Sequence, residues 1–283
     1  MSIESVLTSE LKNKAQGRTI QIVSDFDETL CSTYVFSDRW NTHVPKIRTD
    51  LVLEARKLTN PICIATARTP AELVSWVIWN KLSRLPVPLV AENGAILMWP
   101  LNRVTQLPEI KILASDEQIQ KMTIIQRLME TGAMNDFQLP DGHEIVLRPG
   151  RTATVEIRAQ EIASKKGTPD DYVQIVQELK SILSDSLSFI DIVSSGSSLG
   201  IQPKGISKEV GIIAALEHAV INMEDVFLIG LGDNSNDKPM FDFVKRRGGI
   251  TIGVRNTTEG LCDLTFNEGD EVSLQLLKIV NNL

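Results

Sequence analysis

The stretch TIQIVSDFDET, residues 19–29, decides the fold, because an apolar run here ends in a pair of acidic residues. The β-forming residues Ile22 and Val23 predict a buried strand, and the chain becomes acidic at Asp25. In open α/β sheets, ligands bind beyond the carboxyl ends of the strands. The stretch therefore predicts an α/β protein with a polar site at the end of its first strand.

Strands and helices alternate on both sides of a central segment, which predicts a parallel sheet covered by helices. Thr69 and Pro70 have the pattern of a helix start, and Ser207 is a second candidate N-cap. The expected strands are 19–25, 62–67, 88–92, 226–230 and 249–254, and the expected helices are 3–14, 46–59, 70–85, 208–219, 236–246 and 271–282.

The central segment has a different order, in which one helix is followed by two alternating strands, and this order occurs twice. The helices are expected at 116–131 and 170–184, and the strands at 143–149, 152–158, 188–195 and 198–203. We therefore expect a Rossmann-like parallel-sheet core, formed by residues 1–100 and 202–283, with an inserted α+β (αββαββ) cap domain at 101–201.

The composition is that of an ordinary globular protein and limits the possible partners. The 283 residues carry 29 basic and 36 acidic side chains, for a formal net charge of −7, and 42% are hydrophobic. The acidic balance argues against a nucleic-acid partner. The three cysteines are scattered, no apolar run is long enough to cross a membrane, and no secretory signal precedes the first helix. We expect a cytoplasmic protein without a membrane or nucleic-acid partner, as a monomer or small homo-oligomer.

Two acidic segments follow buried strands. Asp25 and Asp27 follow the first, and Asp233 and Asp237, in the sequence GDNSND, follow the strand at 226–230. Parallel strands end at one edge of a sheet, so these carboxylates can converge, and four carboxylates in one place need a cation such as Mg²⁺. A carboxylate there can also act as a nucleophile or carry a proton. The alternatives are an acidic loop that caps a helix and an ordinary Asn/Asp turn.

Two further residues can bind a phosphate at the same edge. Thr66 ends the second strand, and its hydroxyl can donate to a phosphate oxygen. Lys208 begins a helix, where its ammonium and the helix N-terminus both favour an anion. Each has an ordinary alternative, a strand-end threonine and a solvated surface lysine, and Lys204 competes with Lys208 for the role.

Taken in chain order, these segments resemble the motifs of the haloacid dehalogenase superfamily, and most closely its class IIB, Cof-like group, which includes phosphatases of sucrose, trehalose and mannosylglycerate phosphates. Two positions depart from the pattern: Glu28 and Ala67 stand where glycine is usual. The matching segments are DFDET (25–29), ATAR (65–68), AENGA (91–95), GISKE (205–209) and GDNSND (232–237).

The resemblance implies a Mg²⁺-dependent phosphatase that hydrolyses a small phosphate monoester, foremost a sugar phosphate, through an aspartyl-phosphate. It implies Asp25 as nucleophile and Asp27 as general acid and base. The other implied roles are metal binding by Asp25, Asp233 and the main-chain carbonyl of Asp27, phosphate binding by Thr66, Lys208 and Asn236, support by Asp237, and substrate binding by Arg68 and Asn93.

Two other functions are compatible with these residues. A phosphohexomutase uses the same aspartyl-phosphate but returns the phosphoryl group to the sugar. A regulatory protein could bind a sugar phosphate without turnover, although it would have lost a catalytic group, and Asp25, Asp27, Lys208 and Asp233 are all present.

Overall fold

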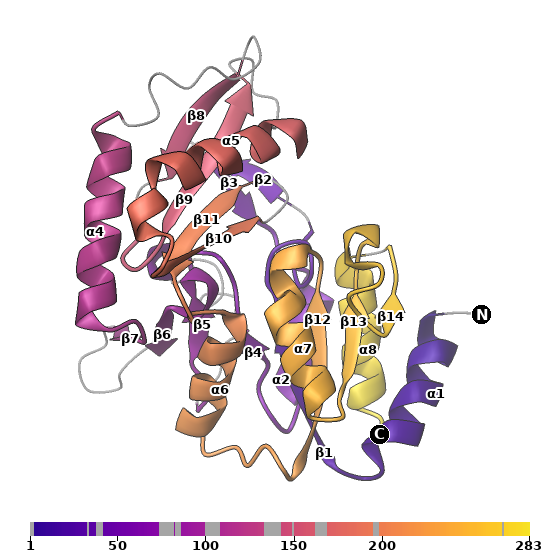
Figure 1. The fold of residues 1–283 in the computed structure, drawn as a ribbon. Coiled ribbons are helices and arrows are strands. Elements are labelled where there is room, and N and C mark those ends of the chain that lie inside the picture. The colour runs from indigo at the N-terminus through magenta and orange to yellow at the C-terminus, as the bar shows by residue number, and fades with distance from the viewer. Residues whose placement is uncertain are drawn as a thin grey trace. The chain divides into compact units, whose positions relative to one another are not determined.

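The computed structural model describes residues 3–32, 34–37, 42–73, 82, 86–99, 108–132, 143–148, 150–161, 169–194, 198–267 and 269–283. The chain divides into two compact units, which are coloured by position along the chain in Figure 1. The core unit comprises Met1–Lys111 and Ser207–Leu283, and the inserted unit comprises Ile112–Ile206. Among the described residues, no helix is both long and apolar enough to cross a membrane.

A five-stranded parallel sheet forms the centre of the core unit, in the order β14-β13-β12-β1-β4. Residue Ser24 of β1 pairs with Leu231 of β12, so the two strands end side by side. All seven residues of β12 are buried, as expected for a parallel strand covered on both faces. The strands are β1 (Thr19–Ser24), β4 (Cys63–Ile64), β12 (Val226–Gly232), β13 (Ile250–Gly253) and β14 (Leu264–Thr265).

The expected strand at 88–92 is present as β5 (Leu89–Ala91), and it continues the parallel arrangement through a single bridge between Ala65 and Val90. Beyond that bridge, β5 belongs to a three-stranded sheet with β6 (Ile96–Trp99), to which it is antiparallel, and β7 (Glu109–Ile112), and the sequence did not predict this sheet. A separate hairpin joins β2 (Tyr34–Ser37) to β3 (Thr42–Pro45).

Helices flank the core sheet close to their expected positions. In Figure 1, α7 lies on the near side of β12. Helix α6 contacts β4 and β5, and α8 contacts both α1 and α2. Only the first turn of the expected helix 70–85 is described, as α3, and residues 74–81 and 83–85 lie outside the described part. The helices are α1 (Ile3–Ala15), α2 (Thr49–Lys57), α3 (Pro70–Leu73), α6 (Lys208–His218), α7 (Lys238–Arg246) and α8 (Gly269–Val280).

The inserted unit has the expected order of one helix followed by two strands, repeated once. Its four-stranded sheet has the order β10-β11-β9-β8 and is antiparallel throughout. Apolar side chains from both helices and the sheet, such as Ile125, Ile157 and Leu179, form its core. The elements are α4 (Asp116–Glu130), β8 (His143–Arg148), β9 (Val155–Glu161), α5 (Pro169–Ile182), β10 (Ile190–Ser194) and β11 (Leu199–Pro203).

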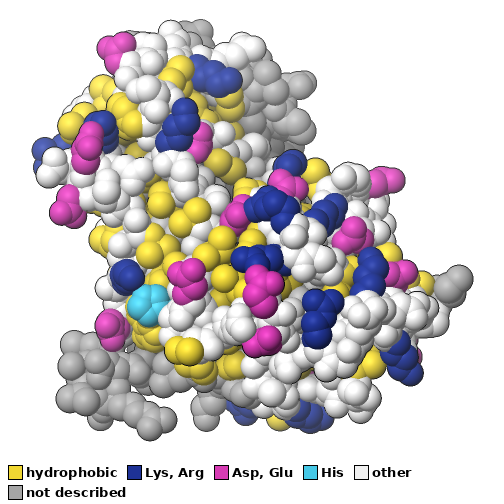
Figure 2. Space-filling model, turned by 60° about the horizontal axis from the view of Figure 1, so that its bottom comes forward, with side chains coloured by type: hydrophobic (Ala, Val, Ile, Leu, Met, Phe, Trp, Pro, Cys, Tyr) yellow, Lys and Arg dark blue, Asp and Glu magenta, His cyan; other side chains and the backbone are white. Residues whose placement is uncertain are grey.

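The predicted fold class, a parallel α/β core with an inserted α+β unit, is confirmed. On the face shown in Figure 2, acidic and basic side chains are interspersed, so the coloured part of that face has no single sign of charge.

Candidate active site

Three buried carboxylates meet at the carboxyl edge of the core sheet. Asp25 follows β1 and Asp233 follows β12, and the parallel register brings these ends together, with the Asp25 amide donating to the carbonyl oxygen of Leu231 at 2.9 Å. Each of Asp25, Asp233 and Asp237 has a carboxylate oxygen within 4.8 Å of those of the other two. The convergence follows from the two strands being parallel neighbours.

Lys208 lies inside this group of carboxylates. It is the first residue of α6, whose N-cap Ser207 accepts from the amide of Val210. Its Nζ lies 2.6 Å from Oδ1 of Asp25 and 2.6 Å from Oδ1 of Asp237. Burial lowers the pKa of Lys208, but the charges of Asp237 and Asp25 outweigh it and raise the pKa above its usual value. An ammonium has three protons, so one can still be donated to a ligand.

Asp237 holds the turn that carries Asp233. Its Oδ2 accepts hydrogen bonds from the amides of Asp233, at 2.9 Å, and Asn234, at 3.1 Å. A Cβ at Gly232 would lie 2.5 Å from this same oxygen, which explains why glycine occupies that position. Both oxygens of Asp237 therefore have donors, and the carboxylates of Asp25 and Asp233 are the better placed to receive a cation.

Charge in this buried group favours a divalent metal. Burial is the main reason that the pKa of Asp25 is raised to about 7 and that of Asp233 to about 9, and the neighbouring carboxylates add to both shifts. With all three acids ionised, three carboxylates and one ammonium leave two negative charges, which one divalent cation would neutralise. Carboxylate oxygens suit a hard cation, so the donor set fits Mg²⁺.

The carboxylate of Asp27 makes a separate set of contacts. Arg68 donates from Nε to Oδ2 at 2.8 Å and from Nη2 to Oδ1 at 2.5 Å. The Tyr34 hydroxyl, at the start of β2, donates to Oδ1 at 2.5 Å, and Glu72 accepts from Arg68 at 3.1 Å. Asp27 is thus outside the three-carboxylate cluster, and metal binding by its main-chain carbonyl stays a prediction.

The remaining predicted residues lie near the same edge. Thr66 is buried, and its hydroxyl oxygen accepts from the amide of Arg68 at 3.2 Å, so its proton can be donated. Asn236 is buried in the turn that follows β12. Asn93 has a left-handed backbone, with φ of 55°, and among the described residues its buried Oδ1 has no hydrogen-bond partner.

Close backbone packing fixes the start of α6, and thereby Lys208. Gly94 has φ of 103°, and a Cβ there would lie 1.8 Å from the carbonyl oxygen of Ser207. Gly211, one turn further along α6, would place a Cβ 2.7 Å from Cα of Gly94. Two glycines thus allow the 3₁₀ turn Glu92–Gly94 and α6 to come into contact. This contact explains the glycine in the segment AENGA.

Three neighbours of the site escaped the sequence analysis. Tyr34 contacts Asp27, Thr257 donates to the main-chain carbonyl of Asp233, and Arg255 lies 3.9 Å from Oδ2 of Asp233. None of these residues belongs to a motif, and no local pattern in the sequence points to them. Glu28, which was noticed only as a departure, has φ of 58° and pairs with Arg255.

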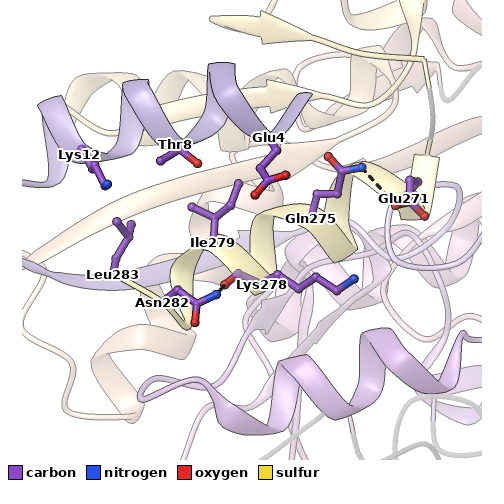
Figure 3. Close-up of a pocket in the computed structure, with 9 residues that line it drawn as sticks. All are labelled: Glu4, Thr8, Lys12, Glu271, Gln275, Lys278, Ile279, Asn282 and Leu283. Carbon is purple, nitrogen blue, oxygen red and sulfur yellow. Dashed lines mark hydrogen bonds between the residues drawn. The ribbon is translucent and has the colours of Figure 1, made fainter. Parts of the chain in front are cut away.

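A groove between α1 and α8 is a weaker candidate for the chemistry. It is lined by polar side chains such as Lys12, Gln275 and Asn282, which Figure 3 shows along the two helices. The side-chain amide nitrogens of Gln275 and Asn282 donate to Glu271 and to the carbonyl of Lys278, both residues of α8. Nothing in this groove matches the buried acids at the sheet edge.

The chain is similar to known proteins in sequence and in fold. The family model of haloacid dehalogenase-like hydrolases matches residues 151–264, a range that includes Lys208 and the GDNSND segment. The matched part of the chain is similar to haloacid dehalogenase-like hydrolases. The whole chain is 24% identical over 275 residues to a phosphoglycolate phosphatase from Methanopyrus kandleri, an alignment that covers 94% of this chain and 99% of the relative.

Solved structures share the fold of this chain over nearly its whole length. The C-terminal domain of trehalose-6-phosphate phosphatase from C. albicans has a TM-score of 0.67 at 18% identity, covering 99% of this chain and 97% of that one. A Plasmodium vivax protein described as a HAD/COF-like hydrolase has a TM-score of 0.64 at 15% identity, covering 96% and 99%. These structures confirm the predicted fold, and together with the family match and the curated relative they bear out the predicted resemblance.

Proposed function

We propose that this protein is a Mg²⁺-dependent phosphatase of small phosphate monoesters, that its substrate is a sugar phosphate, and that it works through an aspartyl-phosphate. The observation that carries the proposal is the buried Asp25 carboxylate, bonded to Lys208 and adjacent to Asp233 at the sheet edge. Phosphoryl transfer mainly needs a positioned nucleophile and compensation of the phosphoryl charge. This group of residues supplies both.

In the first step, a carboxylate oxygen of Asp25 attacks phosphorus, and a P–O bond to Asp25 forms as the P–O bond to the leaving alcohol breaks. Asp27, two residues along the same loop, gives a proton to the leaving oxygen, so that a neutral alcohol departs. The contacts from Arg68 and Tyr34 orient the Asp27 carboxylate. In this step the Asp27 carboxylate is released from these contacts, so that it can take up a proton and contact the substrate.

In the second step, Asp27 takes a proton from water, and the water oxygen attacks phosphorus. The bond between phosphorus and Asp25 breaks, which regenerates the carboxylate and releases inorganic phosphate. Lys208 remains hydrogen-bonded to Asp25 and Asp237, and its third N–H donates a hydrogen bond to a phosphoryl oxygen. Thr66 and Asn236 hold other phosphoryl oxygens.

Asp25, Asp233 and the carbonyl of Asp27 would hold the Mg²⁺ ion, which supplies charge compensation to the phosphoryl oxygens. Asp237 serves these residues indirectly, because it fixes Lys208 and the amide of Asp233. Arg68 and Asn93 are proposed to contact the substrate. The unpartnered Oδ1 of Asn93 is the strongest support for a ligand there.

The inserted unit is the part proposed to select the leaving group. Similarity to the trehalose-6-phosphate phosphatase domain favours a sugar phosphate. The alignment with a phosphoglycolate phosphatase over 94% of the chain favours phosphoglycolate as a second candidate. A phosphohexomutase stays a third, because it shares the aspartyl-phosphate and differs only in the acceptor. We place the reaction in the cytoplasm, since the scattered cysteines suit a reducing compartment.

The deciding experiment measures phosphate release from the purified full chain with Mg²⁺, over sugar phosphates, phosphoglycolate and a generic aryl phosphate. Turnover of one sugar phosphate far above the aryl ester, abolished by EDTA, supports the proposal. Preferential turnover of phosphoglycolate would replace the substrate class and keep the chemistry. Isomerisation of a sugar phosphate without phosphate release, dependent on a sugar bisphosphate, would identify the mutase. No turnover with any of them would contradict the proposal.

A further inference from the structure

Glu28 adopts a backbone conformation that its side chain makes costly. It follows Asp27 in the motif-one loop, and its φ of 58° lies in the left-handed region that favours glycine. Its amide donates to the carbonyl of Cys31 at 2.7 Å, which closes the turn. Glycine would take this conformation without strain, so the presence of a glutamate calls for a reason in its side chain.

The Glu28 carboxylate pairs with a guanidinium from the opposite end of the sequence. Oε2 of Glu28 accepts from Nη2 of Arg255, in the loop that follows β13. The other terminal nitrogen of Arg255, Nη1, lies 3.9 Å from Oδ2 of Asp233. Arg255 therefore stands between two carboxylates, hydrogen-bonded to Glu28 and short of a hydrogen bond to Asp233.

This arrangement sets two attractions on Arg255 against each other. The Asp233 side chain is 10% exposed and that of Glu28 is 26% exposed, so water weakens the attraction to Asp233 less. The Glu28 contact nonetheless holds the guanidinium away from Asp233. Without Glu28, Arg255 would have Asp233 as its remaining partner at this site and would occupy a carboxylate that a cation needs.

We propose that Glu28 and Arg255 are positioning residues that set the affinity of Asp233 for the divalent cation. Arg255 competes with the cation for Asp233, and Glu28 restrains Arg255. The inference rests on the proposed function, because it assigns the cation to Asp25 and Asp233. In this arrangement Arg255 also offsets the repulsion between the buried carboxylates when the cation is absent.

The proposal predicts opposite signs for the two partners. Glu28→Gln weakens Mg²⁺ binding about three- to tenfold, because the released guanidinium moves to Asp233. Arg255→Gln tightens binding by about the same factor, because a positive charge near the ligand is removed. In the Arg255→Gln background, Glu28→Gln has no effect, since Glu28 acts through Arg255.

The experiment measures the Mg²⁺ dissociation constant by isothermal titration of the full chain, stripped with EDTA and free of substrate. Glu28→Gly is included because it removes the carboxylate while fitting the backbone conformation, so a folding defect cannot produce its effect. The loop of Arg255 has other anchors, as Thr257 donates to Asp233 and Thr258 to the carbonyl of Arg255. Glu224→Gln, which breaks a second Glu–Arg pair with Arg247 on the surface, is the matched control.

Weaker binding in both Glu28 variants, tighter binding in Arg255→Gln and no further change in the double variant are the expected results. Weaker binding in Arg255→Gln, or an equal Glu28→Gln effect in both backgrounds, overturns the inference and leaves the phosphatase proposal standing. Failure of the unaltered chain to bind Mg²⁺ at all overturns both. A change in Glu224→Gln as large as in Glu28→Gln would also overturn it, because the effect would then not be local.

Discussion

Arg68 bonds to both carboxylate oxygens of Asp27, with Nε 2.8 Å from Oδ2 and Nη2 2.5 Å from Oδ1. A guanidinium fork that binds both oxygens of a carboxylate fixes the orientation of that carboxylate as well as balancing its charge. The two acids of the motif-one loop are therefore held by different cations, Asp25 by Lys208 and Asp27 by Arg68. This separation suits two carboxylates with different tasks in one reaction.

Replacing the fork should slow turnover more than it weakens substrate binding. Arg68→Lys keeps the charge but cannot bond both oxygens of Asp27, so we expect kcat to fall about tenfold with KM changed less. Steady-state kinetics on the best substrate measures this. Arg246→Lys, in a surface pair with Glu209, is the control and should behave like the unaltered chain. An unchanged kcat in Arg68→Lys would mean that Asp27 does not depend on the fork.

Loss of the proposed nucleophile should abolish hydrolysis without unfolding the core. Asp25→Asn removes the attacking carboxylate and leaves Lys208 paired with Asp237, so we expect turnover to fall at least about 1,000-fold with an unchanged far-UV circular dichroism spectrum. Asp242→Asn, which removes a surface carboxylate paired with Lys238, provides the comparison. Substantial hydrolysis by Asp25→Asn would refute the assignment.

A methyl group at Gly94 should disturb the core and the site together. Gly94→Ala places a Cβ against the carbonyl of Ser207 and also strains a left-handed residue, so we expect a loss of about 3 kcal/mol of unfolding free energy. Gly17→Ala is the matched control: it has φ of 75° but no atom within 4 Å of the added Cβ, and should cost about 1 kcal/mol. Urea unfolding measures both, and equal losses would contradict the close-packing argument.

Magnesium should stabilise the protein more as the pH rises. An aspartate titrates near 3.8 in the unfolded chain, whereas the pKa values of Asp25 and Asp233 are raised to about 7 and about 9. The stability that these groups contribute without metal is full below about 3.8 and is lost as the pH rises through about 7 and then about 9. A cation needs both groups ionised, so it opposes this loss.

Thermal unfolding with Mg²⁺ and with EDTA tests that expectation. The increase in Tm on adding Mg²⁺ should be larger near pH 8.5 than near pH 6. Asp233→Asn removes one of the two groups and should reduce both the increase and its pH dependence. An increase that is the same at both pH values in the unaltered chain would show that these carboxylates do not control metal binding.

The sequence predicted the helices and strands whose apolar residues recur at a clear spacing or end at a clear boundary. The strand that ends at Asp25 and the strand before Asp233 were found from their apolar runs, and their parallel pairing then implied that the two acids meet. The strand at 96–99 was missed because it follows a turn of three residues and looks like a continuation of the previous strand. The strand at 264–265 has only two residues, too few to show a pattern.

The contacts around the site were harder to predict, because no local sequence pattern links the residues that make them. Tyr34 is an ordinary strand residue until the hairpin brings its hydroxyl to Asp27. Arg255 is separated from Glu28 by 227 positions, and no spacing rule links them. Glu28 was noticed because it replaces a usual glycine, and only the backbone conformation gives that replacement a meaning.

The chain leaves the core unit after Lys111 and re-enters it at Ser207, one residue before Lys208. The inserted stretch likewise contains none of Asp25, Thr66, Asp233 and Asp237. The residues proposed to carry out the reaction and those proposed to select the substrate are therefore encoded by separate segments of the sequence. A recombination event that exchanged everything between these two points would deliver a new insert without altering one residue of the carboxylate–lysine cluster. A protein that arose in this way could keep the same reaction and act on a different substrate.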